Sequence, residues 1–242
     1  MTSTKKHVLI LGGSSDIGIE VIKKFLQLNW NVTGHFFRNK KKLLELQKVS
    51  KNLNLIKFDF VNYKSRNVEK LIAKKFSKKY DSIVNLVGYI DNKGFENTNL
   101  KTILKSLVSN AILPLLIQKI VVKKMLSKKW GRILNCSGVG VKFGGGKNSY
   151  NYHLSKHCLE FIPNSYKNWA KKNVLINNLR IGVTDTKIHK RMKKNLKRGD
   201  RLKLIPINRM AKPIEIARYI IDLATEKNSY MTGQTINVSG GE

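Results

Sequence analysis

The chain has 242 residues, with 47 Lys and Arg against 15 Asp and Glu, which gives a formal net charge of +32. Hydrophobic residues make up 41% and charged residues 26%, so the composition is that of a folded chain with a sizeable core rather than a disordered one. Only two cysteines occur, which excludes a disulfide-rich secreted scaffold and a multi-cysteine zinc site.

The excess of positive charge has two explanations. A nucleic acid or another polyanion as partner would account for it, because Lys and Arg neutralise phosphates. However, 38 of these residues are Lys and 9 are Arg, and they are spread along the chain. Proteins that bind phosphates commonly use clustered Arg, so we favour compositional bias, as in an AT-rich genome, over a nucleic-acid partner.

The apolar stretches are short. Residues 8–11 end at Gly12, and residues 111–117 contain Pro114. A signal peptide needs about 7–15 apolar residues and a membrane span about 20. We therefore expect a soluble, cytoplasmic protein with no membrane partner.

Short apolar runs alternate with helical patterns along the chain. The runs predict seven strands, at 7–11, 31–37, 53–58, 82–87, 131–136, 174–181 and 234–238. The periodic segments predict helices at 17–28, 68–76, 100–126, 150–171 and 213–224, with Pro114 as a kink or an exposed turn. This alternation predicts an α/β fold with one domain over 1–242: a Rossmann-like doubly wound sheet of seven parallel strands with helices on both faces.

A glycine-rich turn follows the first strand. Gly12 and Gly18 bracket it, so the backbone can approach a pyrophosphate, and the next helix points its N–H groups at the same place. A tight turn without any ligand is the alternative for this motif alone.

Tyr152 and Lys156 are four residues apart in a predicted helix, so their side chains share one face. Together with other motifs, this pair resembles the short-chain dehydrogenase/reductase family over the whole chain, in the branch of the 3-oxoacyl-carrier-protein reductases. The other motifs are Gly12 with Gly18, residues 85–88, Asn110, residues 209–213, residues 232–234 and residues 239–241.

The resemblance implies catalytic roles for three residues. Tyr152 would be the general acid/base, and Lys156 would lower the tyrosine pKa from about 10 and hold the nicotinamide ribose. Asn110 would hold a water for proton relay. The cofactor site that the resemblance implies consists of Gly12, Ser14, Ile17, Gly18, Arg38, Asp59, Phe60, Asn85, Gly88, Tyr152, Lys156 and Thr186.

Several positions depart from the family pattern, and two of them bear directly on the site. Asp16 replaces the middle glycine of the cofactor turn; a carboxylate near phosphates either points away or caps the helix, and we favour capping. Gly138 stands where the family has its catalytic serine, and Ser137 would substitute for it only if the loop turns. Losing one such hydrogen-bond donor costs around a hundredfold in rate, by analogy with oxyanion donors. The protein would then be a slow enzyme, an enzyme with another donor, or a non-catalytic nucleotide-sensing or nucleic-acid-binding protein on the same fold; we favour an enzyme.

Residues 35–40, at the end of the second strand, contain no carboxylate to bind the ribose hydroxyls of NAD. Arg38 could instead pair with a 2′-phosphate, or be part of an ordinary solvated face. The sequence therefore favours NADP as cofactor, with NADPH preferred and NAD not excluded.

Of the 18 residues from 187 to 204, nine are Lys or Arg. The resemblance places the substrate lid at about 187–208, and a basic lid suits an anionic carbonyl substrate, either a small molecule or one bound to a carrier. A 3-oxoacyl thioester and an anionic keto-sugar both remain open, as does an ordinary solvated loop. Lys128, Lys129 and Arg132 are candidates to contact an acidic carrier protein.

His153 and His157 are interpreted as packing or interface residues rather than a zinc pair, and we expect no metal site. The family resemblance implies a homo-oligomer, a tetramer or a dimer.

Overall fold

Seven strands, all paired in parallel, form one sheet in the order β3-β2-β1-β4-β5-β6-β7. The structure is a computed structural model that describes residues 5–62, 67–187 and 202–242. The strand bounds are β1 His7–Leu11, β2 Asn31–Phe36, β3 Leu53–Lys57, β4 Ser82–Asn85, β5 Gly131–Gly138, β6 Val174–Ile181 and β7 Thr235–Val238. The predicted doubly wound sheet of seven strands is confirmed.

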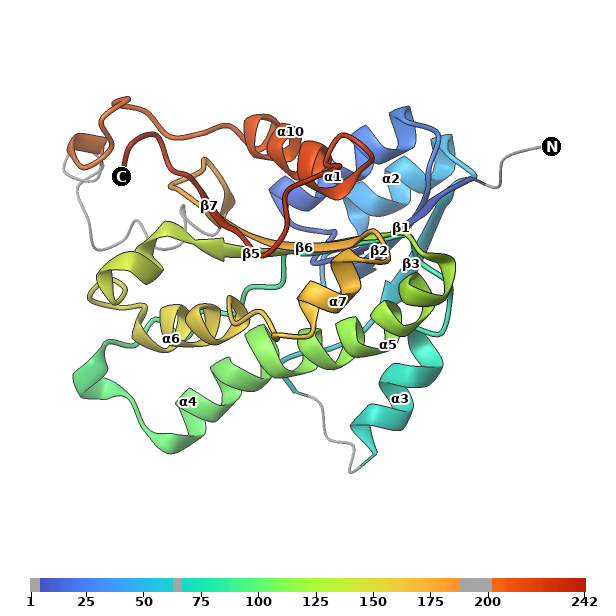
Figure 1. The fold of residues 1–242 in the computed structure, drawn as a ribbon. Helices are drawn as coiled ribbons and strands as arrows, with labels where there is room; N and C mark the ends of the chain where they lie inside the picture. The colour runs from blue at the N-terminus through green and yellow to red at the C-terminus, as the bar shows by residue number, and fades with distance from the viewer. Residues whose placement is uncertain (1–4, 63–66, 188–201) are drawn as a thin grey trace.

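Helices cover both faces of this sheet (Figure 1). On one face lie α1 Asp16–Gln27, α2 Lys41–Val49 and α10 Pro213–Ala224; on the other lie α3 Val68–Lys75, α4 Leu100–Leu107, α5 Leu113–Lys128, α6 Tyr150–Leu159 and α7 Tyr166–Ala170. The strand order reverses between β1 and β4, and ligands of open α/β sheets bind outside the carboxyl ends of the strands at such a point.

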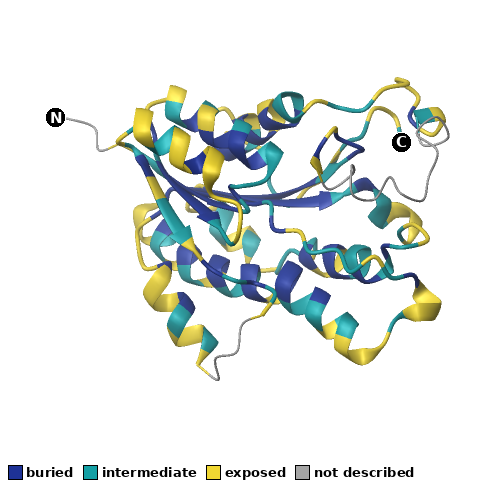
Figure 2. Ribbon diagram, turned by 180° about the vertical axis from the view of Figure 1, so that it is seen from behind, coloured by how far each residue is buried: buried dark blue, intermediate teal, exposed yellow. Residues whose placement is uncertain are grey.

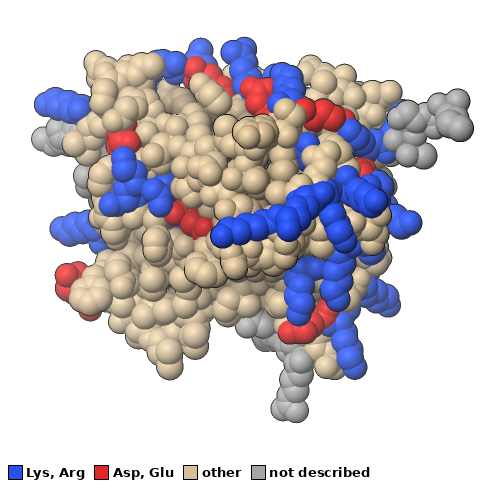
Figure 3. All heavy atoms as spheres, viewed as in Figure 1, with Lys and Arg blue, Asp and Glu red and all other residues tan. Residues whose placement is uncertain are grey.

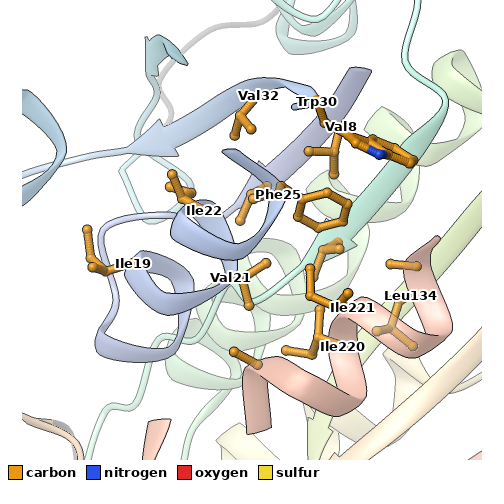
Figure 4. Close-up of a cluster of buried hydrophobic side chains, with 14 of the residues drawn as sticks. Val8, Ile19, Val21, Ile22, Phe25, Trp30, Val32, Leu134, Ile220 and Ile221 are labelled. Carbon is orange, nitrogen blue, oxygen red and sulfur yellow. The ribbon is translucent and has the colours of Figure 1, made fainter. Parts of the chain in front are cut away.

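A hydrophobic core lies on each face of the sheet, and the strands between them are largely buried (Figure 2). Successive side chains of β1 point to opposite faces of the sheet and so contribute to both cores. Val8 packs toward α1 and α10, whereas Leu9 packs toward α5. In the first core, Phe25 of α1 lies close to Ile221 of α10 (Figure 4). Burying such a side chain contributes about 1.5–3 kcal/mol, so these contacts hold the strand ends in place.

The predicted helix at 100–126 is continuous but irregular. A π-helical turn, Val108–Ile112, joins α4 to α5. Pro114 is buried in the first turn of α5, directly after the π-helical turn, so the expected exposed turn is wrong; the expected kink stays a prediction. By length and composition, Leu100–Lys128 could span a membrane, but seven residues of α5 are buried, and α5 packs against the sheet.

Two other helix predictions need correction. The segment predicted as one helix at 150–171 is α6, a loop that contains Pro163, and the short α7, because proline does not continue a helix. Helix α2 was not predicted. Elsewhere the predicted and observed ends differ by at most two residues.

Candidate active site

A cleft of about 1010 Å³ opens at the carboxyl ends of the central strands. The structure places ten of the predicted site residues on its wall: Gly12, Ser14, Ile17, Arg38, Asp59, Phe60, Gly88, Tyr152, Lys156 and Thr186. Gly18, Asn85 and Asn110 do not line it. Most of the predicted nucleotide and catalytic residues thus belong to one site. The remaining three hydrogen-bond residues next to the cleft.

The glycine turn is held against the end of β4. Gly12 has φ +80°, and a Cβ there would lie 2.8 Å from the carbonyl oxygen of Leu86. Ser15 closes the turn, because its Oγ donates to Gly12 O (2.8 Å) and accepts from Gly18 N (3.0 Å). A Cβ on Gly18 would lie 2.6 Å from Gly12 O, so α1 starts in direct contact with the turn. This is the close backbone approach that a pyrophosphate site requires.

Asp16 does not cap α1, contrary to our expectation. Ser15 is the N-cap, and Asp16 is the first residue of the helix, from which its carboxylate turns aside. Its Oδ2 accepts from the backbone N–H of Lys187 (2.9 Å), and Lys42 Nζ lies 3.6 Å from its Oδ1. The carboxylate is therefore engaged with partners of positive character.

His35 is a site residue that sequence reasoning missed. Its buried imidazole accepts from Gly12 N through Nδ1 (3.0 Å) and donates from Nε2 to Phe58 O (2.9 Å). The ring also packs edge-on to Phe60, with ring centroids 4.8 Å apart. Burial lowers the pKa of His35 to about 4, which keeps the neutral tautomer that these two bonds need. A histidine in the middle of an apolar strand was the available signal.

Acid is expected to destabilise the fold through His35. Its folded-state pKa of about 4 lies below the ordinary 6.5, so the unfolded chain takes up the proton first. The contribution of His35 to stability is then complete above pH 6.5 and is lost as the pH falls to 4, by up to about 1.4 kcal/mol per pH unit. Urea unfolding at pH 7, 6 and 5 measures it.

The matched control for this prediction is His35→Asn, which does not titrate in this range. Burial also lowers the pKa of His7 to about 4, so both proteins retain the His7 contribution. Between pH 4 and 6.5 the unfolding of His35→Asn should take up one proton fewer than that of the wild type. Its unfolding free energy should therefore fall less steeply as the pH is lowered. Equal pH dependence in the two proteins would contradict the assignment.

Lys156 anchors the centre of the cleft. It is almost fully buried, and its Nζ donates to Val87 O (2.7 Å) and Cys136 O (2.8 Å), next to the ends of β4 and β5. Burial lowers its pKa to about 8. The ammonium lies 5.8 Å from the centre of the Tyr152 ring.

Tyr152 is a protonated phenol at neutral pH. Burial raises its pKa to about 12, because desolvation disfavours the phenolate, so the expected lowering of this pKa by Lys156 is not found in this structure. The ring lies beside Gly88, where a Cβ would be 3.9 Å from the phenol oxygen. A protonated phenol on the wall of a cleft is a proton donor.

The side chain of Asn110 hydrogen-bonds two segments of the chain. Its Oδ1 accepts from Tyr89 N (2.7 Å), and its Nδ2 donates to Tyr89 O (2.9 Å) and to Ser155 Oγ (2.9 Å). It thereby ties the segment after β4 to the helix of Tyr152. The water-holding role that the resemblance implies stays a prediction.

The other cofactor candidates are also held by neighbours. Asp59 Oδ1 accepts from the backbone N–H groups of Val61 (2.8 Å) and Asn62 (3.1 Å). Asn85 Oδ1 accepts from Val87 N (3.1 Å). Thr186 Oγ1 donates to Thr184 O at 3.3 Å, at the cleft wall. These contacts fix the loops that follow the strands.

The cleft has no serine at the expected place. A Cβ built on Gly138 would lie 3.9 Å from Cε1 of Tyr152, so this position faces the tyrosine. The hydroxyl of Ser137 is buried and has no hydrogen-bond partner within the described part of the chain. Ser137 lines the cleft, but its hydroxyl oxygen is not exposed there.

Two further expectations from the sequence are corrected. Arg132 is 2% exposed and donates to Asn228 O (2.8 Å) and Asn173 O (2.9 Å), so it cannot contact a carrier protein. His153 packs on the Tyr152 ring, as predicted, and also lines the cleft, whereas His157 is exposed. Within residues 5–62, 67–187 and 202–242, no three His, Cys, Asp or Glu side chains are grouped to hold a metal ion.

Most of the predicted basic lid, residues 188–201, lies outside the described residues; Lys187 and Leu204, at its two ends, line the cleft. Elsewhere, Lys and Arg gather over α3 and the end of α5, whereas the surface over α4 and α6 is largely uncharged in this view (Figure 3). The positive charge is thus unevenly spread, although it forms no single arm along the chain.

The fold and the residues around this cleft are those of a Rossmann-like oxidoreductase. Comparison with known families agrees: the model of a family described as Enoyl-(Acyl carrier protein) reductase matches residues 12–242. The chain therefore belongs to the short-chain dehydrogenase/reductase family.

Individual relatives support this assignment. The chain is 27% identical to the 3-oxoacyl-[acyl-carrier-protein] reductase of Chlamydia pneumoniae, over 100% of this chain and 98% of the relative. It is 32% identical to that of Aquifex aeolicus, over 72% of each chain. The fold matches a solved 3-oxoacyl (acyl-carrier-protein) reductase of Agrobacterium tumefaciens with NADP bound, with a TM-score of 0.85 and 20% identity, over 98% of this chain and 94% of that one. The comparisons do not support a non-catalytic protein.

Proposed function

We propose that the protein is an NADPH-dependent reductase that converts the ketone of a 3-oxoacyl thioester to a secondary alcohol. The observation that carries this proposal is one cleft in which the glycine turn, Tyr152 and Lys156 meet. The phenol of Tyr152 is protonated at neutral pH, as a proton donor for ketone reduction must be.

The cleft fits a dinucleotide. Gly12 forms a cradle that a Cβ would fill, and Ser14 and Ile17 line the same wall at the start of α1. These groups would hold the pyrophosphate, and Arg38, on the wall near the end of β2, would hold a 2′-phosphate. When bound, NADPH supplies a hydride to the carbonyl carbon.

The chain itself supplies position and a proton. Tyr152 Oη donates its proton to the carbonyl oxygen, which becomes the hydroxyl of the product, and the phenolate left behind is close to the Lys156 ammonium. Lys156 is kept in place by the two carbonyls at the strand ends, those of Val87 and Cys136. The reverse reaction uses Tyr152 as the base.

The cleft wall favours an acyl thioester over a keto-sugar. Phe143 and Leu204 both line it, although each is 58% exposed. Exposed apolar side chains at a cleft suit an acyl chain better than the hydroxyls of a sugar. Lys187 on the same wall suits the phosphate of a carrier or coenzyme arm. The names of the curated relatives also point to this substrate class.

The proposal is tested by following NADPH oxidation with acetoacetyl-CoA, a soluble 3-oxoacyl thioester. We expect turnover that adding a nucleotide-sugar ketone does not inhibit. If only the keto-sugar is turned over, the substrate is a keto-sugar rather than an acyl thioester, and the NADPH-dependent ketone reduction still stands. Absence of NADPH binding would contradict the proposal as a whole.

Cofactor preference is expected to depend on Arg38. Its guanidinium is exposed beside Phe37, 5.1 Å from the ring centre, and no carboxylate lies among residues 35–40. Arg38→Ala should weaken NADPH binding about tenfold and leave NADH binding unchanged, because only NADPH carries the 2′-phosphate. Calorimetry with both nucleotides measures the effect.

Lys40→Ala is the matched control, since it removes a nearby exposed charge that does not line the cleft. It should leave the NADPH dissociation constant within about twofold, because an exposed charge contributes little. An equal loss of NADPH affinity in the two variants would assign the effect to general charge and contradict a specific role for Arg38.

We further propose that the protein forms a homo-oligomer through α4 and the end of α6. Exposed apolar side chains lie there, at Leu100, Leu104, Ile112 and Phe161. This region carries few charges in Figure 3, as an interface core requires. Light scattering on the purified protein decides between monomer, dimer and tetramer.

A further inference from the structure

The cleft lacks a side chain where the substrate oxygen needs a second hydrogen bond. A Cβ on Gly138 would lie 3.9 Å from Tyr152 Cε1 and 3.8 Å from His153 Nε2, so the position points between these two rings. Ser137 also lines the cleft, but its hydroxyl oxygen is itself buried. A group to orient the substrate oxygen beside Tyr152 must therefore come from another residue.

The imidazole of His153 lies next to this position. It lines the cleft, is half-buried, and stands edge-on to Tyr152 with ring centroids 5.0 Å apart. Its Nδ1 lies 2.9 Å from Ser149 O. Because a carbonyl oxygen only accepts, Nδ1 carries a proton and donates it to Ser149, which orients the ring with Nε2 toward Gly138.

A loop of glycines makes room for this ring. A Cβ on Gly140 would clash with Nε2 of His153, and one on Gly145 would lie 2.8 Å from its Nδ1. Gly145 N donates to Gly140 O (2.9 Å), so the loop closes around the imidazole. The ring is thus held between this loop and Ser149, in the orientation that points Nε2 toward Gly138, beside the Tyr152 ring.

We propose that His153 Nε2 takes the place of the absent serine hydroxyl and hydrogen-bonds the reacting oxygen of the substrate. The proposal rests on the reductase function proposed above. Because Nδ1 already donates to Ser149 O, Nε2 donates only when the ring is an imidazolium, which hydrogen-bonds the ketone oxygen and, after reduction, the oxygen of the product hydroxyl. Tyr152 still transfers the proton, so the role of His153 is to orient and stabilise the oxygen as it gains negative charge.

Steady-state kinetics with NADPH and acetoacetyl-CoA test this role. His153→Ala should lower kcat about a hundredfold, as removal of an oxyanion donor does, and leave the NADPH dissociation constant unchanged. His153→Gln should keep kcat within about tenfold of wild type, because its side-chain amide reaches the place of Nε2. His157→Ala, which removes an exposed histidine of the same helix, should leave kcat unchanged.

Placing a serine at position 138 tests directly whether a hydroxyl can replace the imidazole of His153. The space around Gly138 accepts a Cβ at ordinary contact distances, so Gly138→Ser should be tolerated. In the His153→Ala background, Gly138→Ser should recover kcat at least about tenfold, because a hydroxyl then takes over the hydrogen bond. Melting temperatures of all variants identify any that fail to fold, and the Gly138→Ser and His153→Gln single variants then carry the test.

Each result has a clear meaning. If His153→Ala keeps kcat while Tyr152→Phe abolishes turnover, the role of His153 is overturned and the reductase function stands. If His153→Ala loses kcat and neither Gln nor the added serine restores it, His153 only holds the loop, and the role is again overturned. A wild-type protein that binds no NADPH and turns over no ketone contradicts the proposed function itself.

Discussion

Replacing Tyr152 by phenylalanine is expected to lower kcat for ketone reduction by about a thousandfold and to leave the NADPH dissociation constant within about threefold, since a positioned general acid contributes about 10²–10⁴ in rate. Phenylalanine keeps the ring and removes only the proton donor. The ring is half-buried beside Gly88 and packs against His153, so its packing is preserved. Stopped-flow reduction of acetoacetyl-CoA together with fluorescence titration of NADPH separates the two quantities.

Tyr150→Phe is the matched control for this change. Tyr150 is in the same helix and packs on Phe95, with ring centroids 5.1 Å apart, and it does not line the cleft. It should keep full activity. Turnover in Tyr152→Phe close to that of wild type would show that another group delivers the proton, and would remove Tyr152 from the mechanism.

The strands and helices that the sequence predicts best are those with an unbroken buried side. The predicted bounds of β6 and α10 agree with the structure, because their apolar residues end at turn residues on both sides. Helix α2 was missed because only Leu43 among its nine residues is fully buried, and two of its other apolar residues, Leu44 and Val49, are exposed, so no apolar face stands out. The helix at 150–171 was overextended because a periodic pattern does not show where α6 leaves the core before Pro163.

Some features of the candidate site could also be predicted from the sequence, whereas others could not. Tyr152 and Lys156 could be predicted because a four-residue spacing fixes their relation within one helix. The pKa of Tyr152 could not, because it depends on burial by segments distant in sequence. The bond from Gly12 to His35 joins residues 23 positions apart, and no local pattern indicates it.

His153 shows why a missing motif residue is weak evidence against catalysis. In the sequence, Gly138 is simply a lost serine. In the structure, the glycines of the same loop admit an imidazole to the neighbouring space. Fold membership alone would not distinguish a lost function from a replaced group, and the position of His153 Nε2 beside Tyr152 is what makes replacement testable.

Replacing Gly12 by alanine is expected to weaken NADPH binding at least tenfold and to destabilise the fold by about 2–5 kcal/mol. Two effects combine: a non-glycine residue in the left-handed region costs about 1–2 kcal/mol, and overpacking costs about 1–3 kcal/mol more. The second arises because a Cβ would lie 2.8 Å from the backbone oxygen of Leu86, which is held at the end of β4 and has little freedom to move.

Gly144→Ala separates these two effects, because Gly144 has a similar φ of +68° and no atom within 4 Å of its Cβ position. We expect Gly144→Ala to show only the conformational loss, about 1–2 kcal/mol in urea unfolding, with unchanged NADPH binding. The difference between the two variants then measures the contact of Gly12 with the end of β4. If both variants lost the same stability and bound NADPH equally well, the close approach of this turn to β4 would not be what shapes the nucleotide site.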